Sequence, residues 1–292
     1  MNIVVCVKIV VDSSVDVEVD PRTGRVDENG QILTVNPYDW YAINEAVRIK
    51  QRLGEVKITV LSLGSSEVKN TLRKCLALGA DEAMLLYDPI FENLDSYAKG
   101  VVIAKAISLI KHDLILCGLT AIDSNSGQTA AIISDQLNIS LVYGVAGIDF
   151  SADQRSVITY RKIEGGNREI VEADLPAVLA VDLDDREAIY ADLPEVIAAQ
   201  RADIPEVNQK SLGLSADELE QIIPRTKIIS LSKPKARPKR IFTPDPDLLA
   251  PERLRLIIQG GLSEKKGELF EGTSEDIALK VVRFIREKKL ID

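Results

Sequence analysis

Short apolar runs alternate with longer amphipathic segments along the N-terminal part of the chain. Each run has four to eight residues, is rich in β-branched side chains and ends at turn formers or charged residues, as buried strands do. We therefore predict strands at residues 3–7, 56–63, 83–87, 114–117 and 177–181.

The segments between these runs repeat their apolar positions with the period of an α-helix. In the first of them, Ile43 and Val47 fall on one side, and Glu45 falls on the side expected to face solvent. Alternating strands and helices are the mark of a parallel sheet covered on both faces. The predicted fold class is α/β, with a doubly wound, mostly parallel, Rossmann-like sheet. The helices predicted in this way span residues 39–53, 66–78 and 95–110.

The pattern changes in the second half of the chain. Residues 156–173 contain two β-rich stretches around a glycine turn at 164–167, which predicts a β-hairpin added to the sheet. After Asp182 prolines become frequent and no further strand–helix–strand unit is predicted, so this part is interpreted as an extended arm. It ends in a capping sequence, 273–276, before an amphipathic helix at 277–289. That helix docks either on the chain's own core or on a partner subunit, and the sequence leaves both open.

The composition allows a sizeable core, because 46 % of the 292 residues are hydrophobic. The formal net charge is −9, whereas nucleic acids and anionic membranes are bound by clustered basic surfaces. The one dense basic stretch, residues 233–240, contains two prolines and is interpreted as a solvated linker rather than a nucleic-acid patch. We therefore expect no nucleic-acid partner.

The cysteines and the N-terminal sequence bear on the cellular compartment. Cys6, Cys75 and Cys117 form neither a C-x-x-C motif nor an even-numbered disulfide framework. The chain starts with an apolar run that lacks the basic region and cleavage site of a signal peptide, and no apolar stretch reaches about 18 residues. We expect a cytoplasmic protein without membrane insertion.

Residues for acid–base or metal chemistry are scarce. The single histidine, His112, directly precedes a predicted strand and is interpreted as structural, so a site with several histidine ligands is excluded. The chain contains neither G-x-G-x-x-G nor G-x-x-x-x-G-K-[ST]. A bound nucleotide would therefore need a different loop.

The best candidate loop is residues 118–129, which follow the predicted strand 114–117 and lead into a predicted helix at 130–137. Ligands of α/β sheets bind beyond the carboxyl ends of the strands, and a helix N-terminus offers unpaired N–H groups to phosphate. Polar residues of this kind are also common helix caps, and their spacing alone leaves both interpretations open. The candidate phosphate donors are Ser126, Gly127, Gln128 and Thr129.

A second polar cluster is the turn at residues 36–39, directly before the first long helix. By itself it is a turn and a helix cap. Aromatic rings such as Tyr38 and Trp40 can pack on a planar ligand, although packing in a core or an interface is the commoner use.

Taken in order, these segments resemble the β-subunit family of electron-transfer flavoproteins. A further stretch, Tyr190-Ala-Asp-Leu-Pro194, resembles the family's partner-recognition loop. The run that ends in Gly79-Ala-Asp81 and the pattern Ala-Ile-Asp-x-x-x-x-Gln-Thr are the most specific parts of the match. The stretches that carry it are residues 4–8, 36–39 with 42–50, 72–81 and 113–129.

The resemblance implies a heterodimer with an electron-transfer flavoprotein α subunit, an FAD shared with that subunit, and either AMP or a second FAD in this chain. Gln128 and Thr129 would lie near phosphate, and Asn36 near the adenosine. The residues implied in the nucleotide site are Cys6, Asn36, Leu63, Gly118, Ala121, Ile122, Asp123, Ser126, Gly127, Gln128 and Thr129.

The resemblance also implies contacts with partners. Tyr38 matches an aromatic residue that approaches the α subunit's flavin, and Leu193 with Pro194 matches the apolar anchor that inserts into a dehydrogenase. The chain would thus consist of a nucleotide-binding domain, residues 1–190, and a second part, residues 191–292, that holds the recognition loop and the arm with its terminal helix.

The implied activity is electron shuttling between a dehydrogenase, of acyl-CoA or another flavin-dependent type, and another redox partner. No catalytic acid or base is needed, because the chemistry belongs to the cofactor. Family members that serve acyl-CoA dehydrogenases often carry a basic segment after the anchor, whereas residues 195–203 do not. The pair Gln128-Thr129 resembles AMP-binding members, while residues 72–86 and 88–97 resemble flavin-bifurcating members that use NADH. Both nucleotides remain open, with a slight preference for FAD.

Two other classes share a similar sheet. A stand-alone adenine-nucleotide-binding regulator of the universal-stress type usually has a G-x-x-G phosphate loop before its last helix, which is absent here. A ligase of the ATP pyrophosphatase type would show S-G-G-x-D-S after the first strand, where this chain has residues 8–14 without such a loop. Both classes predict a colourless homo-oligomer, whereas the β-subunit interpretation predicts a yellow heterodimer.

Overall fold

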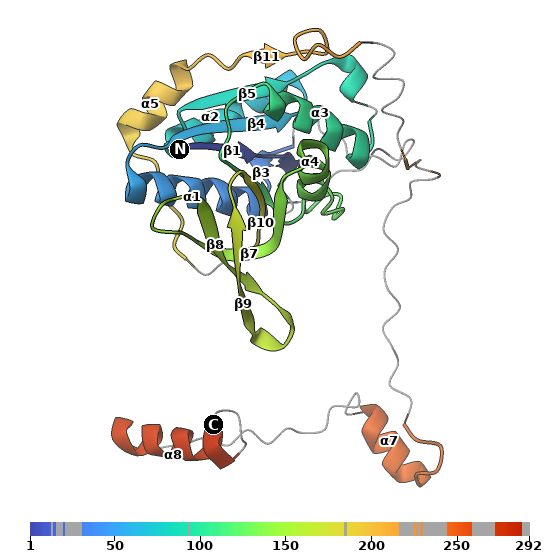
Figure 1. Cartoon of the computed structure of the whole chain (residues 1–292). Helices are drawn as coiled ribbons and strands as arrows, with labels where there is room; N and C mark the ends of the chain where they lie inside the picture. The colour runs from blue at the N-terminus through green and yellow to red at the C-terminus, as the bar shows by residue number, and fades with distance from the viewer. Residues whose placement is uncertain are drawn as a thin grey trace. The chain divides into compact units, whose positions relative to one another are not determined.

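The chain divides into two compact units, Met1–Lys233 and Pro234–Asp292. Within the described residues, the first unit contains a nine-stranded sheet in the order β11-β5-β4-β1-β6-β10-β7-β8-β9 (Figure 1). This arrangement, flanked by helices, confirms the predicted α/β class with a mostly parallel, Rossmann-like sheet. The computed structural model describes residues 1–12, 14–15, 20, 31–92, 94–183, 186–215, 225–226, 229, 244–258 and 272–287.

Five parallel strands lie where the apolar runs predicted them. Their near-continuous apolar sequences fit a sheet that helices cover on both faces. They are β1 Asn2–Cys6, β4 Lys57–Leu63, β5 Glu82–Leu86, β6 Leu114–Gly118 and β10 Ala177–Val181.

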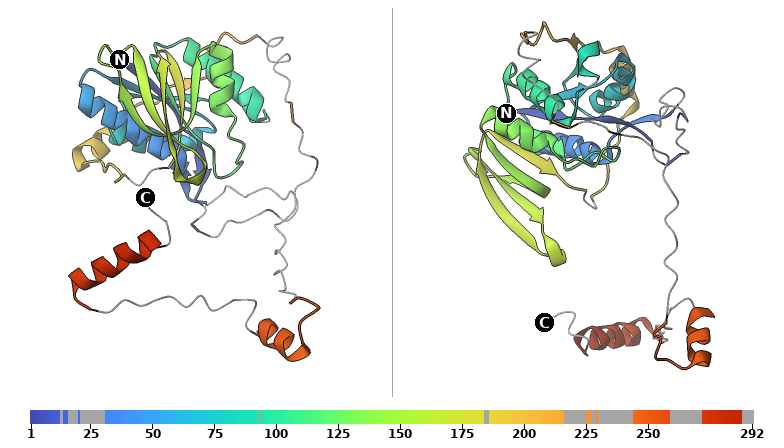
Figure 2. Two further views of the ribbon diagram at one scale, coloured as in Figure 1. Left: turned by 60° about the horizontal axis from the view of Figure 1, so that its bottom comes forward. Right: turned by 90° about the vertical axis from the view of Figure 1, so that its right-hand side faces the viewer.

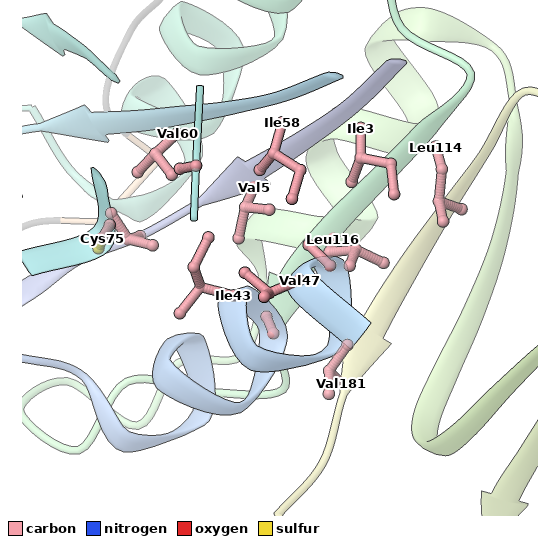
Figure 3. Close-up of a cluster of buried hydrophobic side chains, with 14 of the residues drawn as sticks. Ile3, Val5, Ile43, Val47, Ile58, Val60, Cys75, Leu114, Leu116 and Val181 are labelled. Carbon is pink, nitrogen blue, oxygen red and sulfur yellow. The ribbon is translucent and has the colours of Figure 1, made fainter. Parts of the chain in front are cut away.

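Four helices cover the two faces of the sheet. The alternating side chains of β1 show which helices lie on each face. Ile3 and Val5 belong to the buried cluster that includes residues of α1 and α2. Val4 and Cys6, which point to the opposite face, belong to the cluster with α3 and α4. Figure 3 shows the first cluster, in which Ile43 and other α1 side chains meet the sheet. The helices are α1 Pro37–Leu53, α2 Lys69–Ala77, α3 Ser96–Ser108 and α4 Thr129–Leu137.

The outward face of α1 differs from the prediction. Glu45 was expected to face solvent but is only 4 % exposed. The cause is a later part of the chain: Arg186 pairs with the Glu45 carboxylate at 2.8 Å, and the main chain around Ile189 bonds to the side chain of Asn44. Helical periodicity alone does not reveal this covering segment.

The predicted hairpin is confirmed and is part of a longer antiparallel region. Strands β8, Ser156–Lys162, and β9, Arg168–Asp174, pair across a turn in which Gly165 and Gly166 have positive φ. The apolar pattern does not predict β7, Ser140–Phe150, which pairs in parallel with β10 and antiparallel with β8. Figure 2 shows this region bending away from the rest of the sheet.

The expectation that no further strand–helix–strand unit follows residue 182 is wrong. Helix α5, Leu193–Arg201, leads into β11, Glu206–Val207, which pairs in parallel with β5 at the edge of the sheet (Figure 1). The division of the chain into two parts at residue 190 stays a prediction. The remaining short elements are β2 Ile9–Val11, β3 Leu33–Val35, and the 3-10 helices Ser66–Val68, Pro89–Phe91 and Glu164–Gly166.

The second unit contains α7, Ala250–Ile258, and α8, Ser274–Glu287. The predicted cap is present, because Thr273 Oγ1 accepts a hydrogen bond from Asp276 N at 3.3 Å at the start of α8. The basic stretch at 233–240 and the predicted end of the last helix lie outside the described residues. Among the described helices, none combines the length and the apolar character that crossing a bilayer requires.

Candidate functional site

The two polar clusters singled out in the sequence meet at the carboxyl ends of β1 and β6. These strands are parallel neighbours, with Cys6 opposite Cys117. The loop that follows β6 and the turn that starts α1 enclose a cavity there. The fold thus brings together segments far apart in the chain, at the place where α/β sheets bind ligands. The predicted site residues that line the cavity are Cys6, Asn36, Leu63, Gly118, Ala121, Ser126, Gly127 and Thr129.

Four predicted residues do not line this cavity. Gln128 is exposed at the N-cap of α4, and Tyr38 is half-buried in the first turn of α1. Ile122 and Asp123 are exposed and are not among the lining residues. Their proposed contacts with a nucleotide or a partner stay predictions.

Asn36 fixes the conformation of the loop. Its side chain is fully buried, Nδ2 donates to Thr120 O at 2.8 Å, and Oδ1 accepts from Ile122 N at 3.1 Å. Its own main-chain N–H donates to Lys8 O at 2.9 Å. Asn36 therefore links the loop after β6, through its side chain, to the segment after β1, through its main chain.

Asp39 connects the ends of the same two strands and was not among the predicted site residues. Its buried carboxylate accepts from Lys8 N at 2.7 Å and from Gly118 N at 2.9 Å. Burial raises the pKa of Asp39 to about 7, although these hydrogen bonds act to lower it. In the sequence this residue looks like an ordinary acid in the first turn of a helix, and only the three-dimensional structure shows its burial.

Gly118 makes this close approach possible. A Cβ atom at this position would lie 2.2 Å from Asp39 Oδ1 and 2.7 Å from Tyr38 Cβ, which is far closer than atoms can pack. A side chain there would push Asp39 away from the strand ends. Glycine is therefore required by the packing of α1 against β6.

The start of α4 offers hydrogen-bond donors. Within the described part of the chain, the main-chain N–H groups of residues 126–129 have no acceptor. Gly127 has φ +59°, and the hydroxyl of Tyr143 lies 3.2 Å from Leu119 O and 3.3 Å from Gly127 O, so it bridges the two ends of the loop. This geometry suits an anion, because the N-terminus of a helix carries a partial positive charge.

Two lysines, Lys8 and Lys99, add positive charge to the lining. Lys8 in addition pairs with Asp123 at 2.5 Å. Partial burial acts to raise the pKa of Asp123, but the Lys8 ammonium outweighs it and holds the pKa below its ordinary value. Lys99 reaches the cavity from α3, together with Ser96 and Ile103. The sequence does not single out these α3 residues, because their helix shows only the ordinary amphipathic pattern.

The floor of the cavity is apolar. Cys6 and Cys117 are buried free thiols, and the contact with Cys6 together with burial raises the pKa of Cys117 well above its usual value. Cys117 therefore stays uncharged. His112 lies elsewhere, with Nδ1 2.9 Å from Ile110 O, and does not line the cavity.

The predicted recognition loop lies at the surface. Tyr190 is 87 % exposed and Leu193 is 70 % exposed, and Pro194 follows in the first turn of α5. These large apolar groups have little contact with the described part of the chain. Their binding to a dehydrogenase stays a prediction.

Comparisons with known proteins agree with this fold. Residues 23–212 match the family model of the electron transfer flavoprotein domain. The electron transfer flavoprotein subunit beta of Thermoanaerobacterium thermosaccharolyticum is 38 % identical over 179 residues, which cover 61 % of this chain and 67 % of the relative. The caffeyl-CoA reductase-Etf complex subunit CarD of Acetobacterium woodii is 35 % identical over 180 residues, with the same shares.

Another relative extends the similarity. The electron transfer flavoprotein subunit beta of Megasphaera elsdenii is 31 % identical over 251 residues, which cover 84 % of this chain and 88 % of the relative. These matches support a role in electron transfer and do not favour the universal-stress alternative. Since the family model covers more than half of the residues, this chain belongs to the electron transfer flavoprotein family.

Proposed function

We propose that this chain is the β subunit of a heterodimeric electron transfer flavoprotein, which shuttles electrons between a dehydrogenase and another redox partner. Membership of the family and the names of the relatives support this role. The observation that carries the proposal is the cavity at the ends of β1 and β6, which has donors for an anion at one side and an apolar floor.

The cavity suits the adenosine phosphate that AMP and FAD have in common. The unpaired N–H groups at the start of α4 and the nearby Lys99 favour the phosphate. The apolar floor with Cys6 and Leu63 favours the adenine ring. Asn36 and Asp39 support the site indirectly, since their polar atoms hold the loop and the strand ends.

When bound, flavin supplies the electron chemistry, and the protein supplies binding and position. No acid or base of this chain is assigned to a reaction step. We propose a second FAD in this chain, as in bifurcating carriers that use NADH, in preference to AMP. The similarity to a subunit of the caffeyl-CoA reductase-Etf complex is compatible with this choice.

We further propose a flavin-dependent dehydrogenase, of acyl-CoA or another type, as the electron-exchange partner and the loop with Leu193 and Pro194 as its contact. Tyr38 is proposed to approach the flavin of the α subunit. The cytoplasm is the proposed compartment.

The nucleotide content of the purified heterodimer tests the proposal. The chain is co-expressed with its α subunit, and the FAD and AMP released by denaturation are counted per heterodimer. Two FAD and no AMP are expected. One FAD with one AMP would retain the carrier function but exclude a flavin in this chain, and a colourless homo-oligomer would contradict the whole proposal.

A double substitution tests the location of the site. Thr129→Val with Gln128→Ala removes two polar side chains at the start of α4 but leaves the core intact. We expect about thirtyfold weaker nucleotide retention, because each of the two hydrogen bonds contributes on the order of 1 kcal/mol. The matched control is Gln136→Ala, which removes an exposed amide from the last turn of the same helix. Equal retention in both variants would remove these residues from the site.

A further inference from the structure

A buried carboxylate on α1 belongs to neither the nucleotide cavity nor the core. The side chain of Glu45 is 5 % exposed, and its Oε2 lies 2.8 Å from Arg186 Nη1 and 3.6 Å from Arg48 Nη1. Arg186 also donates through Nη2 to Ala146 O at 2.8 Å. The carboxylate is thus the centre of an ion-pair network that reaches 141 positions along the chain, from 45 to 186.

Neighbouring side chains on α1 bind the main chain of the same segment. Asn44 Oδ1 accepts from Ile189 N at 2.6 Å, while Asn44 Nδ2 donates to Trp40 O at 2.6 Å. Arg48 Nη2 donates to Glu187 O. Residues 186–189 are therefore held to α1 by side chains, although they belong to no helix or strand.

This segment leads directly into the exposed recognition loop. Tyr190 and Leu193 follow within a few residues, and Ile197 lies one turn after Leu193 on the same face of α5. The far end of α5 is held separately, because Ala199 is buried and Arg73 Nη2 donates to Ala202 O at 3.4 Å from α2. The loop is thus held on both sides. The Glu45 network fixes the segment that precedes the loop, and the contacts of Ala199 and Ala202 fix the end of α5.

We propose that Glu45 is a positioning residue for redox-partner recognition, which acts through Arg186 to hold the loop with Leu193 in its binding conformation. The inference rests on the proposed role of Leu193 as the partner anchor. A loop that is already ordered loses less conformational entropy on binding, so the network would lower the concentration of carrier needed for electron transfer. The rate within the formed complex would not depend on it.

The test uses the purified heterodimer with Glu45→Gln, which keeps the size of the side chain and removes its charge. The matched control is Arg52→Gln, also on α1, which breaks the ion pair between Arg52 and Asp149 of β7; this pair involves none of residues 186–189. Hydrogen exchange of the peptide 186–192 is measured by mass spectrometry. We expect faster exchange in Glu45→Gln and wild-type exchange in the control.

The second readout is the steady-state rate at which an acyl-CoA dehydrogenase reduces the heterodimer. The dehydrogenase chosen is one that the wild-type heterodimer oxidises. For Glu45→Gln we expect the KM for the carrier to rise roughly threefold to tenfold at unchanged kcat, because the loop must be ordered on binding. Nucleotide content and reduction of a small dye should stay the same. The pair Glu45→Gln with Arg186→Gln should have no larger effect than either change alone, since both act on one network.

The outcomes separate this inference from the proposed function. Unchanged exchange in Glu45→Gln would overturn the inference. Faster exchange with an unchanged KM would also overturn it, provided that Leu193→Ala raises the KM. If Leu193→Ala leaves the KM unchanged, the anchor role fails, and the exchange data alone then decide whether Glu45 positions the loop.

Discussion

The nucleotide-loop region, residues 36–39 with 118–129, and the recognition region, residues 186–197, are both held by side chains of α1 or its N-cap, but they are built differently. The first is concave and held by side chains that are themselves buried, Asn36 and Asp39. The second is held at its base by Glu45, and it presents large apolar side chains to solvent.

Because of this difference, the two regions should respond differently to substitution. In the nucleotide-loop region the fixing groups and the lining are the same few residues, so a change should affect stability and binding together. In the recognition region the groups that fix the loop and the groups that would contact a partner are separate. Changes there should alter recognition without altering stability, and the following substitutions test this contrast.

The largest effect is expected for Gly118→Ala. The added Cβ would collide with Asp39 Oδ1 at 2.2 Å and with the main chain at 2.8 Å, so α1 must shift away from the ends of β1 and β6. We expect destabilisation of about 3 kcal/mol or more, as for severe overpacking, together with loss of bound nucleotide. Urea unfolding and nucleotide release of the heterodimer measure both.

The control for this substitution is Gly64→Ala, at the end of β4. A Cβ atom there would meet Val68 Cγ1 at 3.4 Å, which is an ordinary contact, and Gly64 has no positive φ. We expect nearly wild-type stability. A Gly118→Ala variant as stable as the control would show that Asp39 does not need its place between the strand ends.

The second effect is a dependence of stability on pH that comes from Asp39. Its pKa is raised by burial from 3.8 to about 7 in the folded state, so at intermediate pH the unfolded chain ionises while the folded protein keeps its proton. Stability is therefore lost as pH rises between these two values. From pH 5 to 7 the expected loss is about 2 kcal/mol.

Asp39→Asn isolates this contribution, because the amide does not titrate. The free energy of unfolding is measured at pH 5, 6 and 7 for both proteins, and the slope of the wild type should be steeper. The variant is less stable at low pH, since its amide accepts fewer N–H groups than the carboxyl site. Parallel pH profiles would mean that Asp39 is ionised throughout, with the Lys8 and Gly118 N–H groups outweighing burial.

Much of the fold could be predicted from the sequence because it depends on local patterns. The runs that form β1 and β6 are apolar throughout, since both faces of the sheet are covered, and the loop after β6 follows from the rule for strand ends. β7 was missed because Gly144 and Gly147 interrupt it and look like turn residues. Their place in a strand depends on the neighbouring strands.

The roles of Asp39 and Glu45 could not be predicted in this way. Each looks like a common helix-surface acid, and each is buried by a segment far away in the sequence, Gly118 for the first and Arg186 for the second. The structural role of such a residue depends on packing against distant parts of the chain. Lys99 was missed for the same reason, because only the approach of α3 to the ends of the strands brings it to the cavity.

The smallest effect on stability is expected for Leu193→Ala. The side chain is 70 % exposed, so its removal leaves no cavity, and the free energy of unfolding should change by less than about 0.5 kcal/mol. Nucleotide content should also stay at the wild-type value. The KM for the carrier with an acyl-CoA dehydrogenase should nevertheless rise, because an apolar anchor that fills a pocket of the partner is lost.

Leu109→Ala, at the end of α3, removes a leucine of similar exposure, 58 %, and should leave both stability and KM unchanged. If both variants raise the KM equally, the effect on KM is not specific to the recognition region. If Leu193→Ala instead destabilises the heterodimer, the loop is packed against the α subunit, and the separation between fixing and contacting groups does not hold.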